Sequence, residues 1–310
     1  MAFTAQDVKA LREKTGVGMM ECKKALTEAD GDMEKAVDYL REKGLAAATK
    51  KAGRTAADGV VLAYTDEAKN IGVLVEVNSE TDFVGKNEKF QEFVLNIAKT
   101  IVEKNPEDVE DLLGVNLAGT DRTVQENLQD LILSIGENMK IRRFERVEGT
   151  TCTYIHAGGS VGVMVTFDTT ADIAAKDEFK EMGKNIAMQI AAMSPQFLDE
   201  ASVPAETIEH EKEIQVAQMK NDPKMANKPD EVLKKIVEGK LGKFYKEICL
   251  MDQEFVRSDL FKGSVSGYVA DTAKKLGGDI KVTGFTRYAK GEGIEKKEEN
   301  FADEIAKMVK

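Results

Sequence analysis

The sequence has little of the chemistry that marks an enzyme. Its 310 residues include only two histidines, His156 and His210, and neither lies at a metal-binding spacing. A phosphate-binding loop of the form Gly-x-x-x-x-Gly-Lys-Ser/Thr is absent, and no Gly-x-Gly-x-x-Gly follows an expected strand. Carboxylates are too plentiful to identify a catalytic pair. These absences favour a protein that acts by binding, without covalent chemistry, a metal ion or a cofactor.

The sequence also has few cysteines and no long apolar run, and its acidic residues outnumber its basic ones. Cys22, Cys152 and Cys249 lie far apart, which indicates a reducing cytoplasm. No apolar run approaches the roughly 18 residues of a membrane span. The first residues have no signal-peptide pattern, so we expect no membrane association. A net charge of −11 argues against nucleic acid as the main partner, because a phosphate-backbone binder normally presents a basic face.

The first part of the sequence has the pattern of three helices. Thr4 and Asp7 fit a capping box, and Gly16-Val17-Gly18 ends the first helix. Asp32 can cap the third helix, whose apolar residues recur at helical spacing up to Leu40. We expect helices over about 5–14, 19–29 and 33–40, followed by a helical or mobile linker over 45–54.

From Ala57 the pattern changes to alternation. Apolar residues at every second position predict a β-hairpin with one buried face, with strands near 60–64 and 71–78. Phe90 to Ile101 then carry one apolar stripe at helical spacing, which predicts a helix packed on the sheet. A second helix over 123–136 and a third strand over 140–147 complete the unit.

This unit occurs twice. Val161, Val163, Val165 and Phe167 repeat the alternation of 71–77, and with one deletion the following helix matches as well. Residues 281–287 echo the third strand. The second copy also carries helical stretches at 206–219 and 231–245, separated by a proline-marked break, which predicts an inserted antiparallel hairpin. A glycine-marked turn at 291–293 and a short helix over 301–309 end the sequence.

These patterns together predict an α+β fold. It consists of an N-terminal three-helix module, a duplicated two-lobed core of antiparallel sheets covered by helices, an inserted helical hairpin and a C-terminal helix. The expected domains are the N-terminal module (1–54), core lobe one (55–148), core lobe two (149–195 and 246–290), the inserted hairpin (196–245) and a C-terminal module (291–310).

The junction between the strand 71–78 and the helix after it carries the most specific candidate site. Thr81-Asp82-Phe83-Val84 places a carboxylate and a large ring side by side, whereas the second copy reads Ala171-Asp172-Ile173-Ala174. One interpretation is a capped helix start with Phe83 as a staple onto the core. The other is that Asp82 and Phe83 project outward. Because the second copy lacks the ring, the scaffold does not require it.

Other candidate contacts lie in the three-helix module. Adjacent helical residues point about 100° apart, so Met19 and Met20 cannot easily face one core. Core packing is the alternative, because methionine fills gaps readily. Arg12 is either a surface residue or a partner contact.

Three further residues lie at element ends. Ile135 and Gly136 end a helix, where either Gly136 or Asn138 serves as the C-terminal cap, or the glycine allows a partner to approach closely. His156 precedes a hairpin turn and is either a surface histidine or a contact. The inserted hairpin is either a self-association element or an exposed decoration.

Long motifs resemble the bacterial elongation factor Ts family. They are Arg12-Glu-Lys-Thr-Gly-Val-Gly-Met-Met-Glu-Cys-Lys-Lys-Ala-Leu26, Glu76-Val-Asn-Ser-Glu-Thr-Asp-Phe-Val84, and Val282-Thr-Gly-Phe285 with Gly291-Glu-Gly-Ile-Glu295. The resemblance covers nearly the whole sequence. One departure is Gly85, where the family often has alanine; a glycine is expected to loosen the first helical turn.

The resemblance implies guanine-nucleotide exchange on elongation factor Tu, bound in its GDP-loaded and nucleotide-free states. It implies that a ubiquitin-associated-like module docks through Arg12, Met19 and Met20. It also implies that Asp82 and Phe83, within Thr81–Val84, lie beside the magnesium site of bound GDP.

The resemblance further implies that Ile135 and Gly136 contact the same partner domain, while His156 contacts another. The inserted hairpin resembles the family's dimerisation element, so a homodimer is possible. Two other classes stay open on the residues alone. A non-catalytic interaction protein would bind its partner without changing the nucleotide off-rate, and an enzyme with an unrecognised site would turn over substrate without any GTPase.

Overall fold

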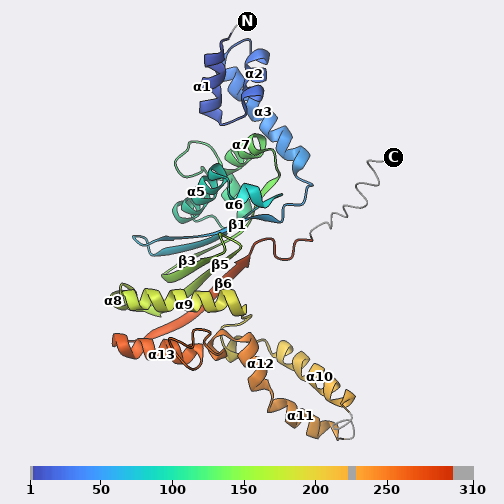
Figure 1. Cartoon of the computed structure of the whole chain (residues 1–310), viewed down its shortest axis with the longest axis vertical. Helices are drawn as coiled ribbons and strands as arrows, with labels where there is room; N and C mark the ends of the chain where they lie inside the picture. Colours follow the sequence, from blue (N-terminus) through green and yellow to red (C-terminus); the bar gives the residue numbers. More distant parts are fainter. Residues whose placement is uncertain (1–2, 223–227, 296–310) are drawn as a thin grey trace. The chain divides into compact units, whose positions relative to one another are not determined.

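The computed structural model describes residues 3–222 and 228–295 and has an α+β fold. Within these residues, thirteen α-helices accompany two small antiparallel sheets of order β1-β2-β3 and β4-β5-β6 (Figure 1). The chain forms two compact units. Of the described residues, the first unit contains 3–146, 155–162 and 288–295, and the second contains 147–154, 163–222 and 228–287. The helix predicted over 301–309 lies outside the described residues.

Three helices open the first unit: α1 Ala5–Thr15, α2 Met19–Glu28 and α3 Met33–Lys51 (Figure 1). The predicted capping box is confirmed, since the Thr4 backbone N–H donates to Asp7 Oδ2 at 2.7 Å and the Asp7 N–H donates to Thr4 Oγ1 at 3.3 Å. Gly16 ends α1 in the left-handed region at φ 70°. The predicted linker is helical as far as Lys51, so α3 is longer than its apolar pattern indicated.

The first sheet follows, with β1 Asp58–Asp66 and β2 Ile71–Ser79 paired antiparallel and β3 Met139–Glu148 beside β2. The helices α5 Glu88–Lys104, α6 Val109–Gly114 and α7 Val124–Ile135 lie on one side of it (Figure 1). The predicted stripe of α5 is buried against the sheet, with Phe90, Ile97 and Ile101 completely enclosed. This packing forms the main core of the first unit.

The expectation of a single buried face is wrong for the central strand. All nine residues of β2 are buried. On the face away from α5, Gly162 lies so near Leu74 that a Cβ on the glycine would come within 2.9 Å of Leu74 Cδ1. Segments distant in sequence therefore cover the side of β2 that the alternating pattern left to solvent.

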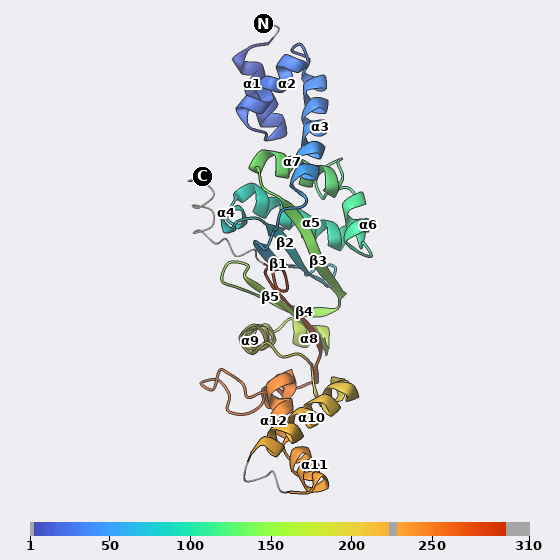
Figure 2. The same cartoon turned by 90° about the vertical axis from the view of Figure 1, so that its right-hand side faces the viewer.

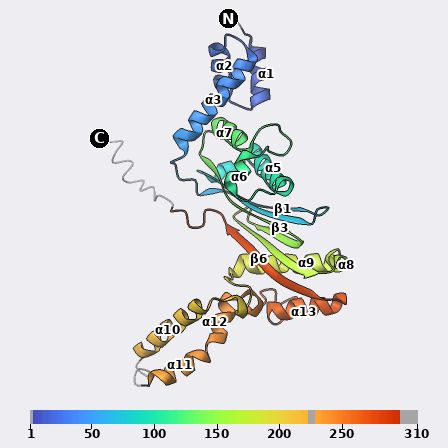
Figure 3. The same ribbon diagram turned by 180° about the vertical axis from the view of Figure 1, so that it is seen from behind.

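The second sheet contains β4 Thr150–His156, β5 Val161–Thr169 and β6 Ile280–Ala289, with α8 Ala171–Ala174 and α9 Asp177–Met193 after β5. The rings of Phe167 and Phe179 meet edge to face at 5.1 Å, which packs α9 on β5. α13 Val265–Leu276, a helix that was not predicted from the sequence, runs beside α9 (Figure 3). The order of elements in this half therefore parallels that of the first: two strands, a short and a long helix, then further helices and a third strand.

The inserted stretch is helical. It contains α10 Ala205–Asn221, α11 Asp230–Glu238 and α12 Leu241–Ile248, flanked by the single turns η1 Glu200–Ser202 and η2 Leu250–Asp252. Buried Met219, Leu233 and Val237 hold α10 and α11 side by side (Figure 3). The helix predicted over 231–245 is divided between α11 and α12, at Gly239-Lys240.

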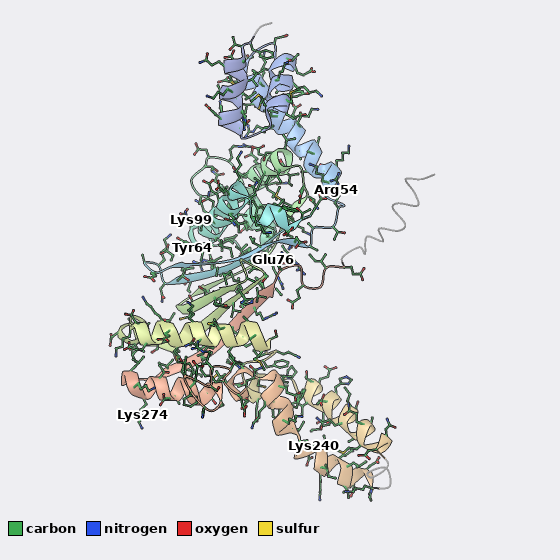
Figure 4. The ribbon with its side chains drawn as sticks, in the orientation of Figure 1. Arg54, Tyr64, Glu76, Lys99, Lys240 and Lys274 are labelled. Carbon is green, nitrogen blue, oxygen red and sulfur yellow. The ribbon has the colours of Figure 1, made fainter. Side chains whose placement is uncertain are left out.

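A buried carboxylate on β2 joins this strand to two other parts of the first unit. This residue is Glu76 (Figure 4), and its side chain has no solvent exposure. Its oxygens accept hydrogen bonds from Arg142 Nη1 at 3.1 Å, Arg143 Nε at 2.7 Å, Asn78 Nδ2 at 3.0 Å and the Gly291 backbone N–H at 2.8 Å. The arginines belong to β3, and Gly291 follows β6. A buried carboxylate needs such partners to remain ionised.

Further contacts hold the segment after β6 in place. The Arg143 guanidinium stacks over the Tyr288 ring at 4.1 Å, and Lys290 Nζ pairs with Asp58 at 2.9 Å. A Cβ on Gly291 would lie 2.1 Å from the Ala57 carbonyl oxygen, so only glycine permits this approach. Residues 288–292 are thus fixed against the first sheet.

Replacing Glu76 tests how much the first unit depends on this charge. Glu76→Gln keeps the shape but removes the buried negative charge that pairs with Arg142 and Arg143, and Arg143 keeps the more exposed Glu292 carboxylate at 3.5 Å. We therefore expect the free energy of unfolding at pH 7 to fall by about 3 kcal/mol. Urea unfolding would measure it, with Glu103→Gln on the exposed face of α5 as the matched control. Equal unfolding midpoints for Glu76→Gln and the unchanged protein would contradict this role.

The same variant has a defined pH dependence. Burial raises the pKa of Glu76, but hydrogen bonds from Asn78, Gly291 and Arg143 outweigh it and bring the pKa below its ordinary 4.5. A depressed folded-state pKa contributes stability above the unfolded value and loses it as the pH falls through the folded value. The deficit of Glu76→Gln should therefore be constant near neutrality and shrink below about pH 4.5.

Candidate functional site

The corner after β2 exposes a large ring to solvent. β2 ends at Ser79, and a separate short helix, α4 Asp82–Gly85, precedes α5 (Figure 2). The Phe83 side chain is 77% exposed, whereas its neighbour Val84 is only 3% exposed. Successive helical residues point about 100° apart, so α4 anchors itself through one residue while presenting the other. The interpretation of Phe83 as a staple onto the core is wrong.

A charged pair accompanies the ring. The Asp82 carboxylate accepts a hydrogen bond from Lys86 Nζ at 2.9 Å, and the same ammonium lies 5.8 Å from the centre of the Phe83 ring. The hydrogen bond and the charge of Lys86 lower the pKa of Asp82 below its ordinary value. The corner therefore presents an ionised acid, an ammonium and an exposed ring within one helical turn.

Helix capping does not explain the corner. Thr81 is the N-cap of α4, but its side chain makes no capping bond. Its hydroxyl instead donates to Glu137 Oε1 at 2.7 Å, and its backbone N–H donates to Glu137 Oε2 at 2.9 Å. The side-chain cap lies further on, where Asn87 accepts from the first N–H groups of α5.

The glycine inside α4 packs closely against β1. Gly85 is buried, and a Cβ at this position would lie 2.9 Å from the Gly59 carbonyl oxygen. The missing side chain allows α4 to rest directly on β1. Gly85 therefore brings the corner into contact with the sheet, while the expected loosening of the first helical turn stays a prediction.

The structure also changes how the two copies align at the corner. The starts of β2 and β5, Ile71 and Val161, lie 90 positions apart. The N-caps of α4 and α8, Thr81 and Thr170, lie 89 positions apart. The single deletion therefore falls between the strand and the cap, and Glu80 has no counterpart in the second copy.

By this alignment Phe83 corresponds to Asp172, and Val84 corresponds to Ile173. Asp172 is exposed and lies inside the first turn of α8, after the N-cap residue Thr170. Ile173 is buried like Val84. The equivalent exposed position thus carries an aspartate in the second copy and a phenylalanine in the first. An exposed charged residue is ordinary, whereas an exposed phenylalanine calls for an explanation.

The turn after α7 lies against this corner. Gly136 ends α7 in the left-handed region at φ 90°, which confirms the predicted C-terminal cap. Gly136 is exposed, while the Ile135 side chain is half-buried against the core of the first unit. The bonds from Thr81 to Glu137 bring these predicted contact residues together with the Thr81–Val84 corner.

The predicted contacts of the N-terminal helices lie at the α1–α2 junction. Arg12 is exposed in the last turn of α1, and Met19 and Met20 open α2 with 52% and 75% of their surface exposed. The alternative of core packing is wrong for both methionines. The junction is joined to α5 by Lys89, whose ammonium donates to the Gly16 carbonyl at 3.1 Å.

His156 is exposed at the end of β4, immediately before a left-handed turn at Ala157 and Gly158. This turn belongs to the first compact unit rather than the second. Of the predicted site residues, Ile135 and Gly136 are brought to the Thr81–Val84 corner, through the hydrogen bonds between Thr81 and Glu137 of their turn. Among the described residues, no group of three or more His, Cys, Asp or Glu side chains is arranged to hold a metal ion. No described helix is both long and apolar enough to cross a membrane.

Comparisons with known proteins agree on one family. A family model described as Elongation factor TS matches residues 80–292. Elongation factor Ts of Clostridium perfringens (strain SM101 / Type A) is 50% identical over 309 residues, which cover 99% of each chain. Elongation factor Ts of Trichlorobacter lovleyi is 49% identical over 312 residues, covering 99% of this chain and 98% of its own. The chain belongs to the elongation factor Ts family.

The part of the chain that matches the family model includes the candidate site. The elongation factor Ts family model begins at Glu80, immediately before the Thr81–Val84 corner, and ends at Glu292, in the segment fixed by Glu76. The N-terminal helices precede the model but fall within the full-length alignments. Elongation factor Ts of Clostridioides difficile (strain 630), for example, is 48% identical over 99% of both chains.

Sequence reasoning missed three carboxylates and one ammonium: Glu76, Glu80, Glu137 and Lys86. Each lies in or near a motif that was singled out, but nothing in the local pattern marks its partner. Glu137 bonds to a residue 56 positions away, and Glu76 to one 215 positions away. The signal available from sequence was weak, because carboxylates are common throughout.

A pair of substitutions tests whether Phe83 contributes to folding. Phe83→Asp introduces the residue found at the equivalent place in the second copy, so the free energy of unfolding should change by no more than about 0.5 kcal/mol. Ile173→Ala, at the buried position of α8, should cost about 2–5 kcal/mol. Chemical denaturation of both variants would measure this, and a large loss for Phe83→Asp would show that the ring belongs to the core.

Proposed function

We propose that this chain is a guanine-nucleotide exchange factor for elongation factor Tu in translation elongation. It binds the GDP-loaded factor, disturbs the magnesium and phosphate site, and promotes GDP release so that GTP can bind. The observation that carries the proposal is the exposed Phe83 ring beside an ionised Asp82, at a corner within the part of the chain that matches the family. The protein itself makes and breaks no covalent bond.

Exchange of this kind needs only differential binding. A nucleotide-binding factor holds GDP through backbone donors around the phosphates and through a magnesium ion. A protein that binds the nucleotide-free or distorted factor better than the GDP-bound one shifts the population toward release. The coupling is reciprocal, so GDP weakens the exchange factor's binding by the same ratio. A thousandfold weakening corresponds to about 4 kcal/mol of differential contact.

Phe83 is proposed as the wedge. Burying a phenylalanine side chain contributes roughly 1.5–3 kcal/mol, and this ring has most of its surface available for burial in a partner. Val84 remains in the core while the ring is buried elsewhere, so inserting the ring does not require the corner to unfold. Other contacts supply the remaining differential free energy.

Asp82 is proposed to act electrostatically. Its carboxylate would bring a further negative charge close to the phosphates of bound GDP. This charge would disturb the water ligands of the magnesium ion. Asp82 is exposed and its pKa is lowered by the Lys86 ammonium, so the carboxylate is ionised at neutral pH before docking. Lys86 is itself exposed, so the pair can open in the complex at little cost, as surface ion pairs contribute little.

The other predicted residues are proposed as docking contacts. Met19 and Met20, with Arg12, form an exposed apolar and basic edge on a ubiquitin-associated-like module, residues 1–54, and flexible methionine side chains suit an adaptable interface. Ile135 and Gly136 would contact the same partner domain as Phe83, because their turn is bonded to the corner.

The second group of contacts is proposed to act away from the corner. His156 would contact another domain of elongation factor Tu, from the turn between β4 and β5. Core lobe two is assigned to residues 149–195 and 246–290.

The inserted hairpin, 196–245, is the proposed self-association element, supported by the exposed apolar side chains of Ile214 and Val232 on its helices.

The wedge is tested by the release of fluorescent GDP from elongation factor Tu in stopped flow. Phe83→Ala should lower the maximal release rate about 10- to 100-fold, because 1.5–3 kcal/mol of burial is lost and 1.4 kcal/mol is a factor of ten. Leu260→Ala, which truncates an exposed apolar residue elsewhere, is the control and should leave the rate unchanged. An unaltered maximal rate for Phe83→Ala would refute the wedge.

The docking edge is tested by the concentration dependence of the same reaction. The double variant Met19→Ala/Met20→Ala should raise the half-saturating concentration about tenfold and leave the maximal rate nearly unchanged, since exposed interface anchors typically contribute 1–2 kcal/mol. Leu45→Ala on α3 removes a comparably exposed apolar side chain and serves as the control. A lowered maximal rate with unchanged half-saturation would assign these methionines a different role.

A further inference from the structure

Two carboxylates accept hydrogen bonds that link the corner carrying Phe83 to the turn after α7. Glu137 accepts both the Thr81 hydroxyl, at 2.7 Å, and the Thr81 backbone N–H, at 2.9 Å. In the opposite direction, Glu80 accepts the Asn138 backbone N–H at 2.6 Å. We call Glu80, Thr81, Glu137 and Asn138 the corner clamp. Each side of the clamp donates to a carboxylate on the other.

The clamp extends to the end of the N-terminal helices. Asn138 is buried and its side-chain amide donates to the Arg54 carbonyl at 2.7 Å. Arg54 lies in the segment between α3 and β1 (Figure 4), and its Nη1 is 3.5 Å from Glu80 Oε1. Three parts of the first unit therefore meet at the base of α4.

The direction of α4 depends on these contacts. The helix has four residues, too few to fix its own axis, and no side chain caps its N-terminus. Both donor groups of Thr81 are used by Glu137 instead. Hydrogen bonds to a charged acceptor are about twice as strong as neutral ones. The residue immediately before Asp82 and Phe83 is thus held from outside the helix.

The second copy shows what the corner is like without the clamp. Gly136 and Gly277 both end a helix in the left-handed region before the third strand, so Glu137 corresponds to Gly278. Glu80 has no counterpart. Thr170 replaces Thr81, but the glycine offers it no carboxylate. A Cβ on Gly278 would lie 2.4 Å from Ile173 Cδ1, so the space beside this glycine is filled by the buried isoleucine.

We propose that Glu137 is the positioning residue of the exchange site. Through Thr81 it fixes the direction in which α4 presents Phe83, and it joins the ring to the Ile135–Gly136 turn as one rigid contact surface. Both carboxylates of the clamp occur only in the copy that carries the exposed ring. The inference rests on the proposed exchange function, since it names a residue that acts through Phe83 without touching the partner itself.

The test compares two substitutions in stopped-flow release of fluorescent GDP from elongation factor Tu. Glu137→Ala should lower the maximal release rate on the order of tenfold with little change in half-saturating concentration, because misplacing a reacting group by about 1 Å is enough for such losses. Glu137→Gln should restore most of the rate, since its oxygen can accept the Thr81 N–H and its amide can donate to the hydroxyl. Glu103→Ala, on the exposed face of α5, is the matched control.

A double substitution separates positioning from general damage. If Glu137 acts through the ring, adding Glu137→Ala to Phe83→Ala should cause no further loss of rate. Losses that multiply fully would overturn the proposal. So would a wild-type maximal rate for Glu137→Ala. Should Glu137→Ala fail to fold, Thr81→Val removes only the hydroxyl donor; it should still slow release several-fold, and an unchanged rate would overturn the proposal.

A measurement without the partner distinguishes failure of this inference from failure of the exchange proposal. Hydrogen exchange of the Thr81 amide in the full chain should accelerate at least tenfold in Glu137→Ala and remain slow in Glu137→Gln and Glu103→Ala, because its acceptor is lost only in the first. Unaccelerated exchange refutes the clamp. An unchanged release rate for Phe83→Ala refutes the wedge, whatever the Thr81 amide shows.

Discussion

The carboxylate of Glu76 is buried in the middle of the central strand of the first sheet, and the arrangement around it depends on keeping that charge solvated. Two arginines of β3, the amide of Asn78 and the Gly291 backbone N–H replace the water that the carboxylate would otherwise bind. Such a set of donors can form only if β2, β3 and the segment after β6 are all in place. The charge thereby links segments that are separated by most of the chain.

The corner with Phe83 continues this strand. Thr81 lies five residues after Glu76. Its backbone N–H and its hydroxyl both donate to a second carboxylate, that of Glu137. Val84 and Gly85 then rest on the core and on β1. An exposed ring on a mobile loop would lose conformational entropy on binding, which reduces affinity. A ring held by buried neighbours avoids most of that loss, and this is why an exposed Phe83 on a fixed corner is suited to entering another protein's site.

The two halves of the chain provide an internal comparison of this arrangement. They share the order of strands and helices, the glycine that ends the helix before the third strand, and a threonine before the short helix. They differ at the places that concern the site: Glu80 is absent from the second half, Gly278 replaces Glu137, and Asp172 replaces Phe83. A change of few residues on a common scaffold therefore distinguishes a corner with an exposed aromatic ring from one with an exposed carboxylate.

The sequence alone determined the elements whose signals are local. The capping box of Thr4 and Asp7, the alternation in β2, the stripe of α5 and the cap at Gly136 all involve residues within a few positions of one another, so backbone geometry relates them directly. The resemblance of whole motifs supplied the family. Tertiary structure decided the rest: that both faces of β2 are buried, that α4 is separate from α5, that the deletion precedes the corner, and that Glu137 holds Thr81. These outcomes depend on which distant segments pack together, and neither the period of a strand nor the spacing of a helix contains that information.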